Sequence, residues 1–208
     1  MKTKKGDFVE LIVTGKLEDG SIFDTNDKEV AKANNFKETL DNIIVCIGKR
    51  EIVEGLDDSL EDKELNKEFE TTIQPEKGFG KKDAKLFQLV SLKKFKDQEV
   101  QPYPGLQINI DGMIGTVKTV SGGRVMIDFN HPLSGRILKY NVKITRIVTE
   151  TKEKVDSFLK NAIGSNIKHE ITENKLHITI DLPEELKKVL QEEVIERIPE
   201  IKEVTFKK

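Results

Sequence analysis

Short β-rich runs separated by glycines dominate the first 150 residues of this 208-residue chain. One run extends from Phe8 to Val13, and Gly20 provides a turn before a second run at Ile22 and Phe23. Runs of this length bounded by turn residues are typical of antiparallel hairpins. No stretch approaches the roughly 18 consecutive apolar residues of a membrane-spanning helix. We therefore expect small sheets and no membrane segment.

A strand, a turn and a short helix are predicted next. Residues 43–47 should form a strand, and apolar residues then recur at helical spacing from Ile52 to Leu60. Residues 68–73 predict another strand. The segment PEKGFGKKD that follows holds one proline and two glycines, which indicates a surface loop with Phe79 as its only large apolar residue.

Four β-rich runs then follow in close succession: FQLVSLKKF, GLQINIDG, GTVKTV and GRVMIDF. Tightly spaced runs separated by glycines predict a small all-β unit. The segment NHPLSG, residues 130–135, interrupts this pattern, and residues 137–148 predict one more long strand.

The pattern changes again near Glu150. One helical face is predicted from the spacing of Val155, Phe158, Leu159, Ala162 and Ile163. Two strands with alternating apolar residues follow, joined by a turn at residues 172–175. Pro183 should open a second helix, and residues 201–206 should close with a strand. The residues of this helix expected to face inward are Leu186, Val189, Leu190, Val194 and Ile198. The order α-β-β-α-β predicts a small α+β domain.

Charge and cysteine content limit the partners and the compartment. The chain has 35 Lys plus Arg against 37 Asp plus Glu, so no strong field exists to attract nucleic acid or an anionic membrane. The single cysteine, Cys46, cannot form an internal disulfide, and the N-terminal sequence lacks the features of a signal peptide. These features favour the cytoplasm.

Groups for conventional catalysis are scarce. The only histidines are His131, His169 and His177, and none has a second histidine at metal-ligand spacing. Cys46 lies in an apolar strand, where a buried thiol is inert, which argues against a nucleophilic pair with His131. Neither glycine-containing segment has the spacing of a phosphate-binding loop. We predict no metal site and no cofactor.

Four segments carry a family resemblance through their order and spacing: VTGKLEDGSIFDT, VCIGKREIVEGLDDSL, PEKGFGKKD and NHPLSGRILKYNVKI. Together they resemble the successive signatures of FKBP-type peptidyl-prolyl cis/trans isomerases. The β-rich insertion resembles the insert-in-flap domain of SlyD-like members, and the whole chain resembles the long-type archaeal members. The resemblance implies an α+β protein whose FKBP domain, residues 1–82 and 130–150, is an antiparallel sheet wrapped on a short helix. It further implies a small all-β insert at residues 83–129 and a C-terminal α+β domain at residues 151–208.

The resemblance also implies a proline pocket. Its catalytic residues would be Asp24, Phe79 and Tyr140, and its substrate-binding residues Phe23, Ile52, Val53 and Leu56. This chain departs from the family pattern at three positions: Leu56 replaces a common tryptophan, and Phe79 and Val13 replace common tyrosines. Because Phe79 has no hydroxyl to donate to a substrate carbonyl, catalysis should depend more on shape and on Asp24, and turnover should be slower. The chain also ends in EVTFKK, without the histidine-rich tail of SlyD, so no nickel site is expected.

The implied mechanism needs no acid, base or nucleophile. Resonance imposes a barrier of about 18–20 kcal/mol on rotation about the peptide bond. An apolar pocket destabilises the planar, dipolar ground state relative to the twisted state, while the Val53 N–H holds the substrate chain. Two roles are open to Asp24: interaction with the carbonyl carbon of the twisted bond, or orientation of a neighbouring loop.

The expected partners are unfolded or partly folded proteins that contain X-Pro bonds. The insert is expected to bind such clients, and residues 151–208 are expected to mediate association with clients or with a second copy of the chain. This last segment has 11 Lys plus Arg against 12 Asp plus Glu, which argues against RNA. Two alternatives remain open: a holdase chaperone with weak or lost isomerase activity, and a binding protein unrelated to proline.

Overall fold

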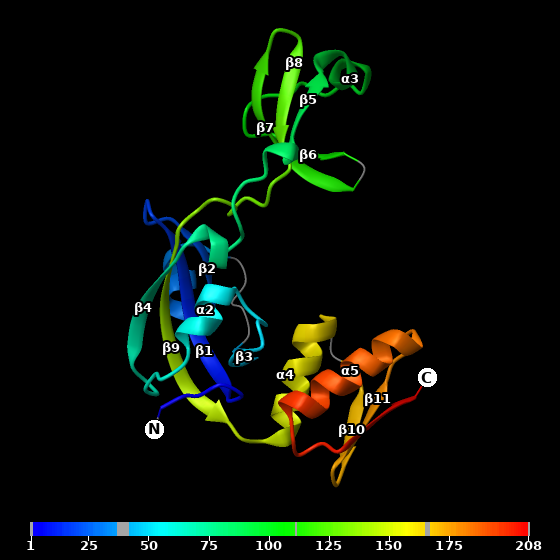
Figure 1. Cartoon of the computed structure of the whole chain (residues 1–208). Helices are drawn as coiled ribbons and strands as arrows, with labels where there is room; N and C mark the ends of the chain where they lie inside the picture. The colour runs from blue at the N-terminus through cyan, green and yellow to red at the C-terminus, as the bar shows by residue number, and fades with distance from the viewer. Residues whose placement is uncertain (1, 37–41, 111, 165–166, 208) are drawn as a thin grey trace. The chain divides into compact units, whose positions relative to one another are not determined.

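The computed structural model describes residues 2–36, 42–110, 112–164 and 167–207 (Figure 1). The chain forms two compact units. The first unit contains Met1–Ile73 and Leu138–Lys208, and the second contains Gln74–Ile137. The predicted α+β class is confirmed, with antiparallel sheets and few helices.

The first unit is built on a five-stranded antiparallel sheet. Its strands run in the order β2-β1-β9-β4, and β3 pairs with β1. Alternating residues of β9 are buried, as expected for a strand with one face on the core. Leu56 of α2 and Leu60, which directly follows this helix, are buried at 4% and 0% exposure, and α2 contacts β4. The elements are β1 (Phe8–Leu17), β2 (Ile22–Thr25), α1 (Lys28–Ala33), β3 (Ile43–Cys46), α2 (Glu54–Ser59), β4 (Glu68–Ile73) and β9 (Leu138–Val148).

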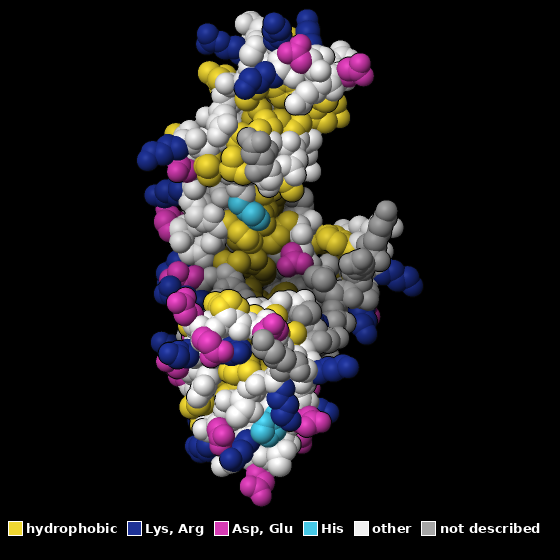
Figure 2. Space-filling view, turned by 90° about the vertical axis from the view of Figure 1, so that its right-hand side faces the viewer, with side chains coloured by type: hydrophobic (Ala, Val, Ile, Leu, Met, Phe, Trp, Pro, Cys, Tyr) yellow, Lys and Arg dark blue, Asp and Glu magenta, His cyan; other side chains and the backbone are white. Residues whose placement is uncertain are grey.

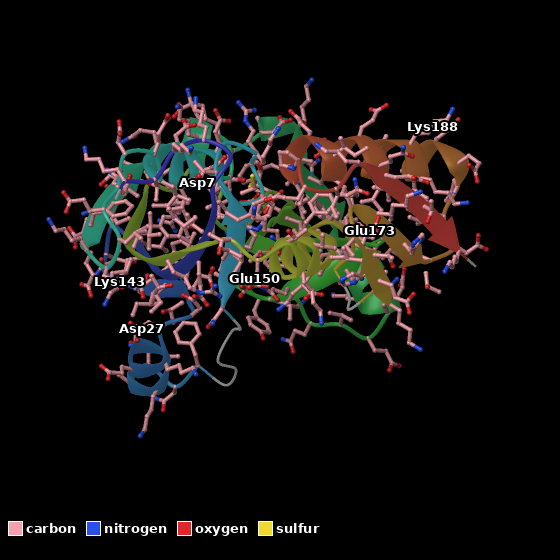
Figure 3. All side chains as sticks on the ribbon, turned by 90° about the horizontal axis from the view of Figure 1, so that it is seen from below. Asp7, Asp27, Lys143, Glu150, Glu173 and Lys188 are labelled. Carbon is pink, nitrogen blue, oxygen red and sulfur yellow. The ribbon has the colours of Figure 1, made fainter. Side chains whose placement is uncertain are left out.

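The short helix α1 follows β2 and is started by a side-chain cap. The Asp27 carboxylate, labelled in Figure 3, accepts hydrogen bonds from the backbone N–H groups of Glu29 and Val30 at 2.9 and 3.1 Å. Such a cap satisfies amides that have no partner within the helix. Asn26, just before it, is buried and accepts the Val13 N–H at 2.7 Å. This bond fixes the end of β2 against β1.

The second unit is a four-stranded antiparallel sheet in the order β5-β8-β7-β6 with one helix, α3. Its core contains Phe95, Val117, Val125 and Ile127. The run at residues 87–95, expected as one β segment, divides into β5 and α3. Ser91 ends the strand and its hydroxyl caps the helix by accepting the Lys93 N–H at 3.3 Å. The elements are 3₁₀ turns η1 (Pro75–Lys77) and η2 (Ala84–Leu86), β5 (Phe87–Ser91), α3 (Leu92–Asp97), β6 (Gln107–Ile110), β7 (Met113–Ser121) and β8 (Arg124–Asp128).

The two ends of this second unit are bonded to each other. Lys82 Nζ lies 2.7 Å from the buried carboxylate of Asp128. Asn130 accepts the Asp83 N–H at 2.7 Å and donates to the Asp83 carbonyl at 3.1 Å. The compact unit extends beyond these bonds, from Gln74 to Ile137, and so includes the segment around Phe79.

The C-terminal part of the first unit consists of a three-stranded sheet and two helices. The strand order is β10-β11-β12, with β10 antiparallel and β12 parallel to β11. Figure 1 shows α4 and α5 lying beside each other on this sheet, and Figure 3 labels Glu150, directly before α4. The elements are α4 (Thr151–Ile163), β10 (His169–Thr172), β11 (Lys175–Thr179), α5 (Glu184–Arg197) and β12 (Glu203–Lys207).

The predicted inward face of α5 is wrong at two positions. Leu190, Val194 and Ile198 are buried, but Leu186 and Val189 are 52% and 55% exposed. A helix turns about 100° per residue, so Leu190 and Ile198 each lie about 40° around the axis from Val194, whereas Leu186 lies about 80° and Val189 about 140° away. Leu186 and Val189 therefore lie outside the buried stripe and reach solvent.

The helices α4 and α5 share one hydrophobic core with the larger sheet. Phe8 of β1, Cys46 of β3 and Val148 of β9 belong to the same buried cluster as Phe158 of α4 and Val194 of α5. This packing connects the C-terminal part to the edge of the sheet where β3 ends. No helix in the described part of the chain is long and apolar enough to cross a membrane.

Candidate functional site

The candidate site is centred on Gly15 in β1. In the sheet register Gly15 pairs with Asp24 of β2 on one side and with Tyr140 of β9 on the other. The register shifts by one residue after Gly15, because Phe23 is an extra residue between the paired Ile22 and Asp24. A bulge of this kind bends the strand and changes the direction of a side chain. The strand order thus brings Tyr140 next to Phe23 and Asp24, two predicted site residues that lie far from it in the sequence.

An aromatic pair occupies the space beside Gly15. The rings of Phe23 and Tyr140 pack edge to face, with centroids 5.6 Å apart and planes at 88°. A Cβ atom on Gly15 would lie 2.5 Å from Cζ of Phe23 and 3.0 Å from Cε1 of Tyr140. Ordinary carbon contacts are about 3.5–4.0 Å. Glycine is therefore required here for the close approach of the two rings.

The environment of Asp24 is partly desolvated. Burial raises the pKa of the Asp24 carboxyl above 3.8, and a hydrogen bond from the Thr25 backbone opposes this shift. Burial, together with the charge of Asp24, raises the pKa of Tyr140 to about 12. The Tyr140 hydroxyl therefore keeps its proton at neutral pH and can act as a hydrogen-bond donor. The site combines one carboxyl, one phenol and apolar ring surface.

The predicted residues Ile52 and Val53 lie in the segment between β3 and α2, and both are half-buried. Val53 is the N-cap of α2 and has non-helical backbone angles, with φ −52° and ψ 129°. Among the hydrogen bonds of the described residues, none is donated by the Val53 N–H. This amide can therefore donate to a bound carbonyl group. Leu56 is buried one turn further on.

The buried carboxylate of Asp57 fixes the turn before Ile52. It accepts the Gly48 N–H and the Arg50 N–H, each at 2.9 Å. Both donors have left-handed backbone conformations, with φ 83° and 54°, which costs energy at Arg50 because it carries a Cβ. Since Asp57 is 3% exposed, its two charge-assisted bonds are shielded from water and hold the turn in place.

Phe79 belongs to the second unit. Its ring stacks on His131, with centroids 4.3 Å apart and planes at 6°. The Ser134 hydroxyl donates to the Phe79 carbonyl at 2.9 Å. The assignment of Phe79 to the proline pocket stays a prediction.

The remaining histidines and the cysteine have structural partners. His169 lies 3.3 Å from Asp156, and His177 Nδ1 is 2.5 Å from the Thr205 hydroxyl. Cys46 is 0% exposed, and burial, with the charge of Glu51 as the next cause, raises the pKa of its thiol to about 12. A thiol in this environment is not a nucleophile at neutral pH.

Sequence comparisons agree with this geometry. Residues 1–97 match the family of FKBP-type peptidyl-prolyl cis-trans isomerases, and residues 88–133 match the IF domain of FKBP26. The chain belongs to the FKBP-type peptidyl-prolyl cis-trans isomerase family. Its catalytic activity is accordingly the cis/trans isomerisation of peptide bonds that precede proline.

Particular relatives support this membership. The short-type peptidyl-prolyl cis-trans isomerase of Methanocaldococcus jannaschii is 33% identical over 144 residues, which cover 68% of this chain and 91% of that protein. The isomerase SlyD of Haemophilus influenzae is 30% identical over 159 residues, which cover 74% of this chain and 77% of that protein. A crystal structure of the three FKBP domains of wheat FKBP73 aligns with 72% of this chain and 42% of that chain, with a TM-score of 0.39 and 16% identity.

Two residues of the site were not predicted from the sequence. The sequence does indicate Gly15, because a glycine inside a strand often marks close approach by another group. Nothing in the sequence indicates Asp57, since an aspartate on a short amphipathic helix is usually solvated. Only the fold shows that its carboxylate lies under the turn at residues 48–50.

Proposed function

We propose that Phe23, Asp24 and Tyr140 form one wall of the proline pocket. The single observation that carries this assignment is their convergence on Gly15, where no larger residue fits. Ile52, Val53 and Leu56 complete the pocket in this proposal.

The chemistry of these groups suits rotation about an amide bond. Apolar ring surface favours the twisted bond, which has lost part of its resonance dipole, over the planar one. The Val53 N–H, which has no acceptor within the part of the chain that the structure describes, can hold the substrate chain by a carbonyl, and Tyr140 supplies a second donor. The carboxylate of Asp24 lies near Tyr140 in a partly desolvated position, where its interaction with a twisted carbonyl would be stronger than in water.

A peptide isomerisation assay tests the assignment. Asp24→Ala and Tyr140→Phe should each lower kcat/KM for an Ala-Leu-Pro-Phe peptide by about 5- to 150-fold, the equivalent of ~1–3 kcal/mol. Lys139→Ala, beside Tyr140 but exposed, is the matched control and should leave the rate unchanged. Wild-type rates in both site variants would contradict the pocket. A wild-type protein without measurable activity would favour the holdase alternative.

We further propose that the insert, residues 83–129, binds unfolded clients. Six large hydrophobic side chains of the second unit are more than a third exposed, and Figure 2 shows hydrophobic side chains gathered over its sheet. Exposed apolar clusters on a small unit mark interaction surfaces. The residues are Leu86, Leu89, Val100, Tyr103, Met113 and Ile114.

The client proposal is tested by comparing two substrates. Leu89→Ser with Ile114→Ser should slow the catalysed refolding of a proline-limited protein, because only a protein substrate gains effective concentration from a second contact. The tetrapeptide rate should stay unchanged. Equal loss of both rates would show that the insert has only a structural role.

Residues 151–208 are proposed to mediate association, either with clients or with a second copy of the chain. The exposed Leu186 and Val189 on α5 provide an apolar surface for this contact. Leu186→Lys with Val189→Lys should abolish a dimer seen by light scattering, while a monomeric wild type at micromolar concentration would exclude stable dimerisation.

The extra C-terminal part also supports the long-type archaeal subtype, because the short-type relative aligns over only 68% of this chain. The balanced charge argues against nucleic acid as a partner. The single buried cysteine fits a reducing compartment, and we propose the cytoplasm.

A further inference from the structure

Two helices of the C-terminal part hold the segment that connects β3 with α2. Asn161 of α4 donates from Nδ2 to Glu51 Oε2 at 3.0 Å. Arg197, the last residue of α5, donates from Nη1 to Glu51 Oε1 at 3.0 Å. Next to it, Glu196 pairs with Lys49 at 2.5 Å. The contacts of the C-terminal helices with this segment are therefore concentrated on Glu51 and Lys49.

The Glu51–Arg197 pair is buried. Their side chains are 6% and 13% exposed, and Glu51 Oε2 also accepts the Cys46 N–H at 3.3 Å. The Arg197 guanidinium lies 5.0 Å from the ring centroid of Phe158, and its buried Nε has no hydrogen-bond partner among the described residues. Burying two charges costs free energy that such a pair regains only with complete hydrogen bonding. The arrangement is therefore better explained by the geometry it fixes than by stability.

Glu51 directly precedes Ile52 and Val53 in the chain. Asp57 fixes the same segment from the side of α2, through its bonds to the turn before Glu51. We propose that Glu51, held by the C-terminal helices, is a positioning residue that keeps the Ile52–Val53 backbone in the conformation that binds the proline-containing chain. The inference rests on the proposed assignment of Ile52 and Val53 to the pocket. It gives the C-terminal part a role in the isomerase reaction itself, in addition to association.

This role has a specific kinetic signature. When only a fraction of the enzyme has the binding-competent conformation, the apparent dissociation constant rises by the inverse of that fraction. Loosening the Ile52–Val53 segment should therefore raise KM and leave kcat nearly unchanged. Irreversible loss of folded protein has a different effect, because it removes active molecules and lowers the apparent kcat at constant KM. Reversible global unfolding would also raise KM, so the stability of each variant is measured alongside the kinetics.

Arg197→Met is the test variant, and Lys154→Met is its matched control. Both cations are largely buried, at 13% and 15% exposure, and both lie over a phenylalanine ring. Both come from the C-terminal helices, but Lys154 pairs with Glu200 and has no bond to the 48–53 segment. We expect KM for the tetrapeptide to rise about three- to tenfold in Arg197→Met, for a competent fraction between roughly a third and a tenth. Lys154→Met should keep the wild-type KM, and thermal unfolding should report the stability of each.

A double variant separates two effects of Arg197→Met: the loss of the contact that positions the Ile52–Val53 segment, and the cost of leaving the buried Glu51 carboxylate unpaired. In Arg197→Met with Glu51→Gln no unpaired carboxylate is buried, so stability should recover relative to Arg197→Met alone. KM should stay raised, because the contact from α5 is still missing. A KM that recovers together with stability, or a KM that is unchanged in Arg197→Met, would overturn the positioning role.

Ile52→Ala distinguishes failure of this inference from failure of the site assignment. A lower kcat/KM in Ile52→Ala together with a wild-type KM in Arg197→Met overturns the positioning role and keeps the pocket. Wild-type kinetics in Ile52→Ala overturn the assignment of this segment to the pocket and the positioning role with it.

Discussion

Replacing Gly15 by alanine should damage the active site far more than the fold. The new Cβ would lie 2.5 Å from Cζ of Phe23, so the ring must move by about 1 Å to reach an ordinary contact distance. Such overpacking costs about 1–3 kcal/mol, and the loss of glycine flexibility in a strand regains about 0.5–1 kcal/mol. The net loss of stability should therefore be about 2.5 kcal/mol or less. A displacement of ~1 Å at the reacting centre, in contrast, can reduce the rate about 100-fold.

The assay is isomerisation of an Ala-Leu-Pro-Phe peptide, with urea unfolding measured in parallel. We expect kcat/KM of Gly15→Ala to fall by about 10- to 100-fold. Gly115→Ala in the second unit is the matched control, since its Cβ would lie 2.6 Å from Ile127 and 2.7 Å from Phe129. Ile127 is 0% exposed and cannot move away. This control should destabilise the second unit and leave the tetrapeptide rate close to that of the wild type.

One result would refute the reasoning about Gly15. If folded Gly15→Ala keeps a kcat/KM within about twofold of wild type, the edge-to-face rings of Phe23 and Tyr140 do not contact the substrate. The double variant Gly15→Ala with Phe23→Leu removes the overlap with the ring, and it should regain stability without regaining the rate. Recovery of both would show that only the fold was affected.

Three further predictions concern groups that are buried or partly buried. Because the pKa of Asp24 is raised in the folded state, the fold binds this proton more tightly than the unfolded chain and loses stability as the pH rises through that pKa. Asp24→Asn should therefore unfold at a higher urea concentration than wild type at pH 7. This gain in stability should disappear well below pH 3.8, where the carboxyl is protonated in both states. A gain that does not change with pH would contradict the raised pKa of Asp24. The Cys46 thiol, with a pKa of about 12, should react with a disulfide reagent only as fast as the protein opens, and a reaction as fast as that of a free thiol would show that the thiol is accessible. Asp57→Ala leaves two backbone amides without an acceptor and should cost about 2–4 kcal/mol in urea unfolding; a loss below ~0.5 kcal/mol, the range of surface changes, would mean that water replaces the carboxylate.

The sequence predicted the strands of the larger sheet well, because their signals are local. Short β-rich runs bounded by turn residues mark β1, β2 and β9 directly. The same reasoning failed where neighbours in space decide the outcome. Leu186 and Val189 have the spacing of a buried face, but the packing of α5 centres on Val194 and leaves both exposed. In the insert, Ser91 caps a helix that the β-rich composition concealed.

The sequence by itself determined the fold class, the order of the strands and helices along the chain, and the residue types available to a site without acid, base or nucleophile. Only the tertiary structure decided that Gly15 stands between Asp24 and Tyr140, because strand register and a one-residue bulge depend on long-range pairing. It also decided that Glu51 and Arg197, which are 146 positions apart in the chain, form a buried pair beside the segment carrying Val53. A charged residue is usually solvated, and no local pattern shows which one loses its water when two distant helices pack against a turn.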